Sequence, residues 1–388
     1  MFSESLSALA FDLVGLMAGL AFACFSALFA SKPWGLRAYP CILTVRGVVG
    51  GLVCGRLSSG LWLGTVRPSL TSNTKEFKII YHTALVLSSA AALMMGPVVW
   101  LYGLPAGLGP GEALEATAAL LFTMTLAFLT TMPIPALTAF TAFKHGVNPD
   151  VVTYPVGSTS SDVLVTCCFA GAVALASLGQ PGLVIEALIG AAFLASGAVV
   201  LFSHRRDGRF LRALKEGLLA SSMAIAISGL TGLLLADVQA TIGLWPGLCL
   251  VYPAIMSTMG DVGSVVGSTA TTKLAIGTME PGLRALKGHS REIGAVWAAS
   301  LLMFFSYGII SALVFPGGPG PGFFLIALLA TNLVAFWAVV SLSLLAGMAT
   351  YRHGLDPDNF VIPVESSAAD ALTTLALLLA LGLVAGVS

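Results

Sequence analysis

Two stretches of this chain are similar to each other. Residues 39–64 read YPCILTVRGVVGGLVCGRLSSGLWLG, and residues 252–277 read YPAIMSTMGDVGSVVGSTATTKLAIG. They align without a gap, and the shared positions are Tyr39, Pro40, Gly47, Gly50 and Gly64, which match Tyr252, Pro253, Gly260, Gly263 and Gly277. A second pair, VNPDVVTYPVGSTSSD (147–162) and LDPDNFVIPVESSAAD (355–370), aligns at a slightly smaller separation, because the loops of the two copies differ in length. The chain therefore contains an internal repeat.

The composition of the chain is that of a membrane protein. Of its 388 residues, 57% are hydrophobic and only 9% are charged, which is far from the makeup of a water-soluble domain. Apolar runs of about 20 residues, the length of helix that crosses a bilayer core, recur from end to end. This composition predicts the lipid bilayer as a partner. Because the formal net charge is zero, no nucleic acid is expected.

The apolar runs divide each repeat into five spans. In the first repeat, residues 1–178, they lie near 8–31, 40–64, 79–101, 114–143 and 154–178; in the second, residues 213–388, near 217–240, 249–277, 293–315, 322–350 and 361–386. Residues 179–212 form a linker with one more apolar run, near 182–203, and a basic loop. Because five is odd, this extra span lets both repeats insert with the same orientation, related by an axis along the membrane normal. The sequence thus predicts an all-α polytopic membrane protein of about eleven transmembrane helices, with two parallel five-helix repeats joined by a linker helix.

Basic residues concentrate in alternate connections between these spans. With the N-terminus in the cytoplasm, the cytoplasmic side carries Arg67, Lys75, Lys78, Lys144, Arg205, Arg206, Arg209, Arg212, Lys215, Arg284, Lys287, Arg291 and Arg352. The opposite side carries only Lys32 and Arg37. Because Lys and Arg are enriched in cytoplasmic loops, the pattern predicts a multi-pass protein of the cell membrane with a cytoplasmic N-terminus and an external C-terminus.

Each repeat carries an aspartate inside its fifth span. Asp162 and Asp370 follow Pro155 and Pro363 by seven residues, which is about 10 Å along a helix. So short a side chain cannot extend to water from that depth, and a buried carboxylate in a membrane span indicates function. Hydroxyl residues stand four positions from each aspartate on the same helix face: Ser158 and Thr166 in the first repeat, Ser366 and Thr374 in the second.

Two interpretations of these polar stripes are open. They can form hydrogen bonds between helices inside the protein, as Ser and Thr often do in membranes. Alternatively, both stripes line a pore, where two aspartates, hydroxyls and water make an oxygen-only site. Such a site suits a hard divalent cation, and Mg²⁺ in particular keeps much of its water and needs few carboxylates. We therefore expect Asp162 and Asp370 to be metal ligands.

The other charged residues within the spans leave alternatives open. Asp261 has no acidic counterpart, because Val48 aligns with it, and it either pairs with Arg46 or adds a metal contact. Arg46 itself either lines the site or extends to the outside. Lys273 lies close to the cytoplasmic end of its span and is best explained by extension to that surface. Arg56 is deeper, and we expect it to line the pore or to form an ion pair.

The second span of each repeat is rich in glycine. Such small residues let helices approach closely, and they also bring backbone carbonyls near a pore. We expect both effects at Gly47, Gly50, Gly260 and Gly263.

Several of these stretches resemble the MgtE and solute-carrier family 41 magnesium transporters. Residues 252–277 resemble the proline- and glycine-rich second helix of these proteins, and GLDPDNFVIPVESSAADALTTLALLL (354–379) looks like their fifth helix, which contains the ion-binding aspartate. CGRLSSGLWLG (54–64) is similar to a Ser-Arg-Leu-Ser-Thr segment of the solute-carrier branch, which implies that Arg56 belongs to that pattern.

This resemblance implies that Asp162 and Asp370 take the place of the pore-lining aspartate that MgtE dimers supply once from each subunit. One chain would then be a fused pseudo-dimer and would function as a monomer. Two departures matter: Asp261 stands where an Asn is usual, and the first repeat has RGVV (46–49) instead of a Gly-Asn pair.

The leading hypothesis is therefore transport of a divalent cation through a pore on the pseudo-twofold axis between the repeats. Mg²⁺ is the expected transported ion, and the sequence does not rank it against Mn²⁺ or Co²⁺. The alternative is a proton- or sodium-coupled secondary transporter of a small solute, with the aspartates as coupling-ion sites. An enzyme is not expected, because the chain shows no clustered His, nucleophile elbow or multi-Asp metal motif.

The topology predicts which loops a membrane-impermeant thiol reagent reaches. Cysteine introduced by Gly317→Cys should be labelled from outside intact cells, and cysteine introduced by Gly208→Cys only after permeabilisation. The reverse pattern would overturn the orientation derived from the basic residues.

Overall fold

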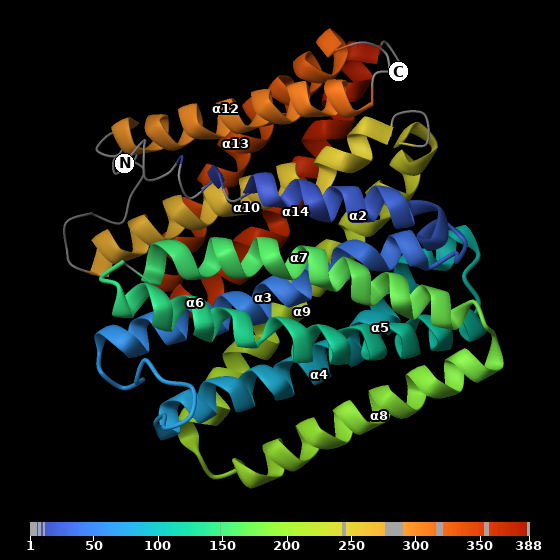
Figure 1. Ribbon diagram of the computed structural model, residues 1–388. Helices are drawn as coiled ribbons and strands as arrows, with labels where there is room; N and C mark the ends of the chain where they lie inside the picture. The colour runs from blue at the N-terminus through green and yellow to red at the C-terminus, as the bar shows by residue number, and fades with distance from the viewer. Residues whose placement is uncertain are drawn as a thin grey trace. The chain divides into compact units, whose positions relative to one another are not determined.

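The computed structural model of the protein describes residues 6, 9–10, 12–147, 149–242, 246–275, 290–315, 321–352 and 357–385. These residues form α-helices, one short 3-10 helix and their connections, with no strand among them (Figure 1). Eleven helical segments in this part of the chain are long and apolar enough to cross a membrane. The predicted class, an all-α polytopic membrane protein with about eleven spans, is therefore confirmed.

The helices pack into two compact units, each described by itself. The first unit is Cys24–Leu233, and the second unit is Met1–Ala23 with Leu234–Ser388. The first unit holds the end of α2 (Asp12–Ala30), then α3 (Gly35–Trp62), α4 (Lys75–Gly103), η1 (Leu104–Ala106), α5 (Pro110–Thr131), α6 (Pro133–Lys144), α7 (Pro149–Ala176), α8 (Gln180–Ser203) and most of α9 (Gly208–Ile242). The second unit holds the start of α2, the end of α9, α10 (Pro246–Ala275), α12 (Ser290–Val314), α13 (Pro321–Arg352) and α14 (Pro357–Ala385).

The glycine-rich helix of each repeat is the central helix of its unit. α3 contacts α4, α5, α6 and α7, and α10 contacts α12, α13 and α14. Of the span residues in α3 and in α10, 89% are buried, against 22% in the predicted linker helix α8, which lies along the edge of the first unit beside α4 and α5 (Figure 1). Small residues allow this dense packing. As a result, the aspartate helices α7 and α14 both lie against the central helix of their unit.

The fourth span of the first repeat is a broken helix. We predicted one span near 114–143, and the structure has one candidate span there, Pro110–Lys144. Within it α5 ends at Thr131 and α6 begins at Pro133. Proline has no N–H to donate and its ring clashes with the preceding turn, which explains the break. α6 packs against α3 and α7, and Pro135 lies in that contact, close to Gly157.

The helix that opens the second repeat packs mainly in the first unit. A Cβ added at Gly232 of α9 would lie 2.3 Å from the carbonyl oxygen of Arg37, and the Tyr102 hydroxyl donates to the carbonyl oxygen of Ala226 at 3.2 Å. In the second unit, a Cβ at Gly19 of α2 would lie 1.7 Å from the carbonyl oxygen of Leu250. The compact units therefore do not coincide with the predicted sequence domains 1–178, 179–212 and 213–388, which stay a prediction about the repeat.

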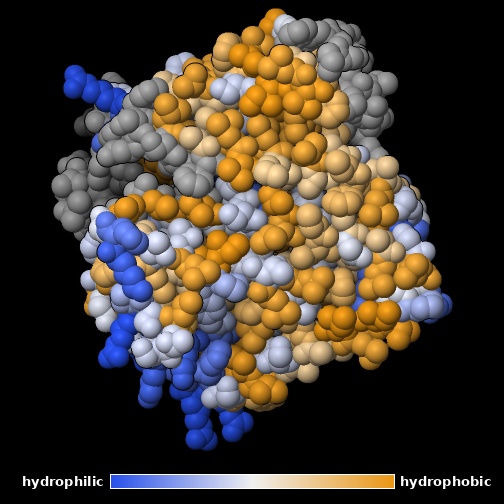
Figure 2. Space-filling view, in the orientation of Figure 1, coloured by the Kyte–Doolittle hydropathy of each residue, from blue (hydrophilic) through white to orange (hydrophobic). Residues whose placement is uncertain are grey.

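Polar contacts gather at both ends of the first unit. At one end Lys32 contacts Glu115 of α5 at 2.5 Å and donates to the carbonyl oxygen of Ala176 at 3.2 Å. At the other end Arg209 of α9 contacts Glu76 of α4 at 3.1 Å. Figure 2 shows hydrophilic side chains projecting where the α3–α4 and α8–α9 connections lie, beside an apolar face. This separation is the one that membrane-crossing helices require, and which end faces the cytoplasm stays a prediction.

Candidate cation site

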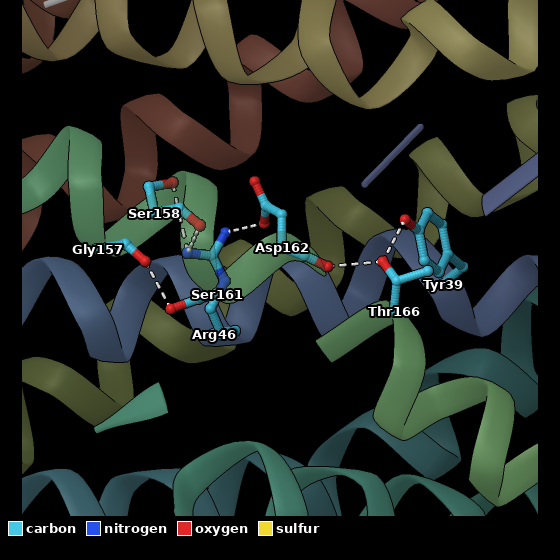
Figure 3. Close-up of polar contacts among 7 residues, drawn as sticks. All are labelled: Tyr39, Arg46, Gly157, Ser158, Ser161, Asp162 and Thr166. Atoms are coloured by element: carbon cyan, nitrogen blue, oxygen red, sulfur yellow. Dashed lines mark hydrogen bonds and ion pairs between the residues drawn. The ribbon is translucent and has the colours of Figure 1, made fainter. Parts of the chain in front are cut away.

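Asp162 is buried and paired with an arginine. It lies on α7, is 6% exposed, and forms an ion pair with Nη2 of Arg46 on α3 (Figure 3). Nη1 of Arg46 donates to the carbonyl oxygen of Ser158 at 3.1 Å and lies 3.4 Å from its Oγ. Arg46 is itself only 7% exposed, so its guanidinium does not extend to the outside, which was one of the two alternatives. The pairing brings a charge-neutral contact to the interface of α3 and α7.

A tyrosine-threonine hydrogen bond joins the central helix to the aspartate helix in both units. In the first unit the Tyr39 hydroxyl lies 2.9 Å from Oγ1 of Thr166, which donates to the carbonyl oxygen of Asp162 at 2.7 Å (Figure 3). In the second unit the same atoms of Tyr252 and Thr374 are 2.9 Å apart, and Thr374 donates to the carbonyl oxygen of Asp370 at 2.8 Å. The Tyr-Pro motif of the repeat thus fixes the position of each aspartate.

The second unit carries a carboxylate that the sequence analysis missed. Glu365 of α14 is fully buried, and its Oε2 accepts a hydrogen bond from Ser264 of α10 at 3.3 Å. A Cβ added at Gly263 would lie 1.5 Å from Oε1 of Glu365, so this glycine makes the space that the carboxylate fills. Asp261 and Asp370 both act electrostatically on Glu365, and they are 4% and 9% exposed.

Glu365 was overlooked because it has no acidic counterpart in the repeat. In the alignment that superposes Asp162 and Asp370, it falls on Gly157, so the comparison of the two aspartate helices did not draw attention to it. The available signal was a lone carboxylate two residues after Pro363 in a predicted span, which by cost alone indicates function.

The remaining predicted site residues have varied surroundings. Gly47 and Gly260 are buried in the two central helices, whereas Gly50 and Arg56 on α3 are half-buried. No Cβ contact within 4 Å would form at Gly50. The side chains of Ser366 and Lys273 lie outside the described residues, so their predicted roles, like the pore-lining role of the glycines, stay predictions.

The donor atoms around these carboxylates are oxygens. Within the described ranges, no three His, Cys, Asp or Glu side chains are grouped so that they could hold a bare metal ion. The six cysteines are free. An ion that retains most of its water needs few direct carboxylates, so the arrangement fits a hydrated hard cation and does not fit a thiophilic or imidazole-bound metal.

One protein family matches this chain twice. The sequence profile of the MgtE family, described as a divalent cation transporter, matches residues 39–172 and again residues 252–380. The two matches begin at Tyr39 and Tyr252, which are the first residues paired by the internal alignment, and each match includes the aspartate of its repeat. They cover most of the chain, and the linker helix α8 lies between them.

Individual relatives are similar over nearly the same length. The rat protein solute carrier family 41 member 3 is 24% identical over 372 residues, which cover 87% of this chain and 77% of the relative. The mouse protein of the same name is 23% identical over 361 residues, with 86% and 72% covered. A crystal structure of the eukaryotic MATE transporter AtDTX14 aligns with 100% of this chain and 93% of its own at 10% identity, but its TM-score of 0.28 carries no argument.

The Arg46–Asp162 pair predicts a large cost for removing one partner alone. Arg46→Met leaves Asp162 buried without its cation, and we expect a loss of about 3–5 kcal/mol in the free energy of unfolding. Combining it with Asp162→Asn should restore most of that loss. Reversible denaturation of both variants and of Asp162→Asn in detergent completes a double-mutant cycle.

Arg209→Met is the matched control, because its pair with Glu76 is 70% exposed at the arginine and should contribute at most about 1 kcal/mol. An Arg46→Met protein as stable as the unmodified chain would contradict the buried ion pair.

Proposed function

We propose, since this chain belongs to the MgtE family of divalent cation transporters, that it moves Mg²⁺ across the cell membrane along a path between its two repeats. The double match of the family profile is the observation that carries the proposal. A path on a pseudo-twofold axis, lined by α7 and α14 with Asp162 and Asp370, follows from the repeat in the sequence. Mn²⁺ and Co²⁺ are the competing ions to be tested beside Mg²⁺.

The chemistry of the buried side chains supports this assignment. Buried carboxylates and hydroxyls are concentrated on α7, α10 and α14. Apolar side chains at these positions would have a lower desolvation cost, and polar groups that are kept inside membrane spans mark ion pathways. Asp261, at 4% exposure, adds a carboxylate on α10, and we infer that it contributes to the attraction of the cation. Their oxygen atoms match the ligand preference of hard divalent cations.

Family membership also weighs against the other functions considered. The family is one of transporters, so an intramembrane enzyme gains no support. Coupled transport of a small organic solute, the alternative from the sequence, has no observation in its favour. Coupling of Mg²⁺ movement itself to Na⁺ or H⁺ is compatible with the same site and is decided by flux measurements.

Flux into liposomes tests the proposed function directly. The purified chain should carry Mg²⁺ into vesicles loaded with a Mg²⁺-sensitive dye, and should restore growth to a host that lacks Mg²⁺ transport. Repeating the flux with and without Na⁺ or pH gradients separates a channel from a coupled carrier. Asp370→Asn should lower the initial flux at low Mg²⁺ by at least about tenfold, the equivalent of about 1.4 kcal/mol. Vesicles with no Mg²⁺, Mn²⁺ or Co²⁺ flux above that of empty vesicles would overturn the proposal.

One chain is proposed to be the working unit, because both copies of the repeat are present within it. A monomer isolated by size exclusion in detergent should bind Mg²⁺ with the same Kd as the unfractionated protein. The separate halves 1–178 and 217–388 should transport no Mg²⁺. Binding that rises with the fraction of dimer would contradict the fused pseudo-dimer.

A further inference from the structure

The two repeats place different charged residues at the positions around their aspartates. Asp162 of the first unit is neutralised by Arg46. In the gapless alignment of the two repeats, the position of Arg46 is taken by Met259, which carries no charge. Two more carboxylates, Asp261 and Glu365, are found in the second repeat instead, where the first repeat has Val48 and Gly157. The duplicated chain is therefore asymmetric where its charges matter most.

The space occupied by Glu365 has an apolar equivalent in the first unit. A Cβ at Gly157 would lie 3.7 Å from Sγ of Cys54 and 3.9 Å from Cγ of Pro135. In the second unit the carboxylate lies over Gly263, with Ser264 donating to its Oε2 at 3.3 Å. Oε1 of Glu365 fills the space beside Gly263. At Gly50, which aligns with Gly263 in the first repeat, no atom lies within 4 Å of an added Cβ. Glu365 and its surroundings are thus particular to the second repeat.

A second hydroxyl, that of Ser343, lies near the space that this carboxylate fills. The Ser343 Oγ on α13 lies 2.9 Å from where a Gly263 Cβ would be, the same point that Oε1 of Glu365 approaches at 1.5 Å. The hydroxyl hydrogen of Ser343 is used, because it donates to the carbonyl oxygen of Val339 at 3.0 Å. Its lone pairs are left to accept. Three helices, α10, α13 and α14, thus direct oxygen atoms to one buried point.

One atom of this group lacks a hydrogen-bond partner. Oε1 of Glu365 has no donor within reach among the described residues, although the side chain is fully buried. A carboxylate taken out of water without compensation is strongly destabilising. Asp261 and Asp370 add negative charge to the same surroundings and increase that cost. The carboxylate is therefore neutralised either by a proton or by a positive ligand that compensates these charges.

We propose that the transported cation is bound inside the second unit, with Glu365 as a ligand that the first repeat lacks and Asp261 and Asp370 as its charge partners. This proposal rests on the proposed function of divalent cation transport. One direct carboxylate, the hydroxyls of Ser264 and Ser343 and retained water suit Mg²⁺, which dehydrates reluctantly. Asp162, held by Arg46, contributes less to binding than its repeat position indicates.

The proposal is tested by titrating the full chain in lipid nanodiscs with MgCl₂ at constant ionic strength, and by Mg²⁺ flux in liposomes. Glu365→Gln keeps the size of the side chain and removes its charge, and should raise the Kd for Mg²⁺ at least about tenfold. Glu365→Asp keeps the charge and should bind more tightly than Glu365→Gln. The charge-neutral double variant Arg46→Met with Asp162→Asn should raise the Kd less than Glu365→Gln does.

Glu186→Gln is the matched control. Glu186 is another fully buried glutamate whose carboxylate oxygens have no hydrogen-bond partner among the described residues, but it lies on the linker helix α8, which packs against α4, α5 and α7. The Kd of this variant for Mg²⁺ should equal that of the unmodified chain. Size exclusion and thermal unfolding without Mg²⁺ verify that each variant folds, and the contrast between Glu365→Asp and Glu365→Gln reports charge even if both are less stable.

Three outcomes would overturn the proposal. A Glu365→Gln protein that binds and transports Mg²⁺ like the unmodified chain would show that this carboxylate is neutral in the working protein. Glu365→Asp no better than Glu365→Gln would show that its charge is not what binds. An unmodified chain that neither binds nor transports Mg²⁺ would overturn both the proposed function and the site. The first two outcomes overturn the site alone, because in them the unmodified chain is active.

Discussion

The cost of placing charge where water cannot reach is the constraint that orders this structure. A carboxylate inside a membrane span must be neutralised by a partner, by a proton or by a bound cation. The first unit uses a partner: Arg46 forms an ion pair with Asp162, and the same guanidinium donates a hydrogen bond to the carbonyl oxygen of Ser158. The second unit has methionine at that position and concentrates three carboxylates. The two copies of the repeat therefore carry different charged residues on the same pair of helices.

Close packing of the central helices makes both states possible. α3 and α10 are largely buried because their glycines and small side chains allow α7 and α14 to come near. At Gly263 the missing side chain is occupied by the Glu365 carboxylate, so any larger residue there would displace it. The tyrosine-threonine hydrogen bond, present in both units, holds each aspartate helix in register with its central helix. Charge placement is thus set by backbone proximity and by one repeated polar contact.

Much of this architecture could be predicted from the sequence because its causes are local or recurrent. Apolar runs of membrane-crossing length, and positions such as Tyr39 and Tyr252 that recur in both copies, identified the spans and the repeat. Individual side-chain pairs were harder to predict: the sequence analysis considered Asp261 as a partner of Arg46, and the packing of α3 against α7 shows that Arg46 pairs with Asp162. Periodicity also does not say which neighbour a helix prefers, so the packing of α9 in the first unit was not foreseen. The break at Pro133 was missed because an apolar run was taken as one helix.

The fused chain explains why such asymmetry can arise at all. In a homodimer each substitution appears in both subunits, so an arginine that neutralises one aspartate neutralises its symmetry mate, and an added glutamate is added twice. In such a homodimer a glutamate added to each subunit would double the desolvation cost. An arginine in each subunit would neutralise both aspartates and so remove the negative charge that attracts a cation. Joining two repeats in one chain separates these choices. Arg46 can stabilise one half while Glu365 is confined to the other, and the position that is glycine at 157 can hold glutamate at 365. Residues that differ between the repeats are therefore as informative about function as residues that they share.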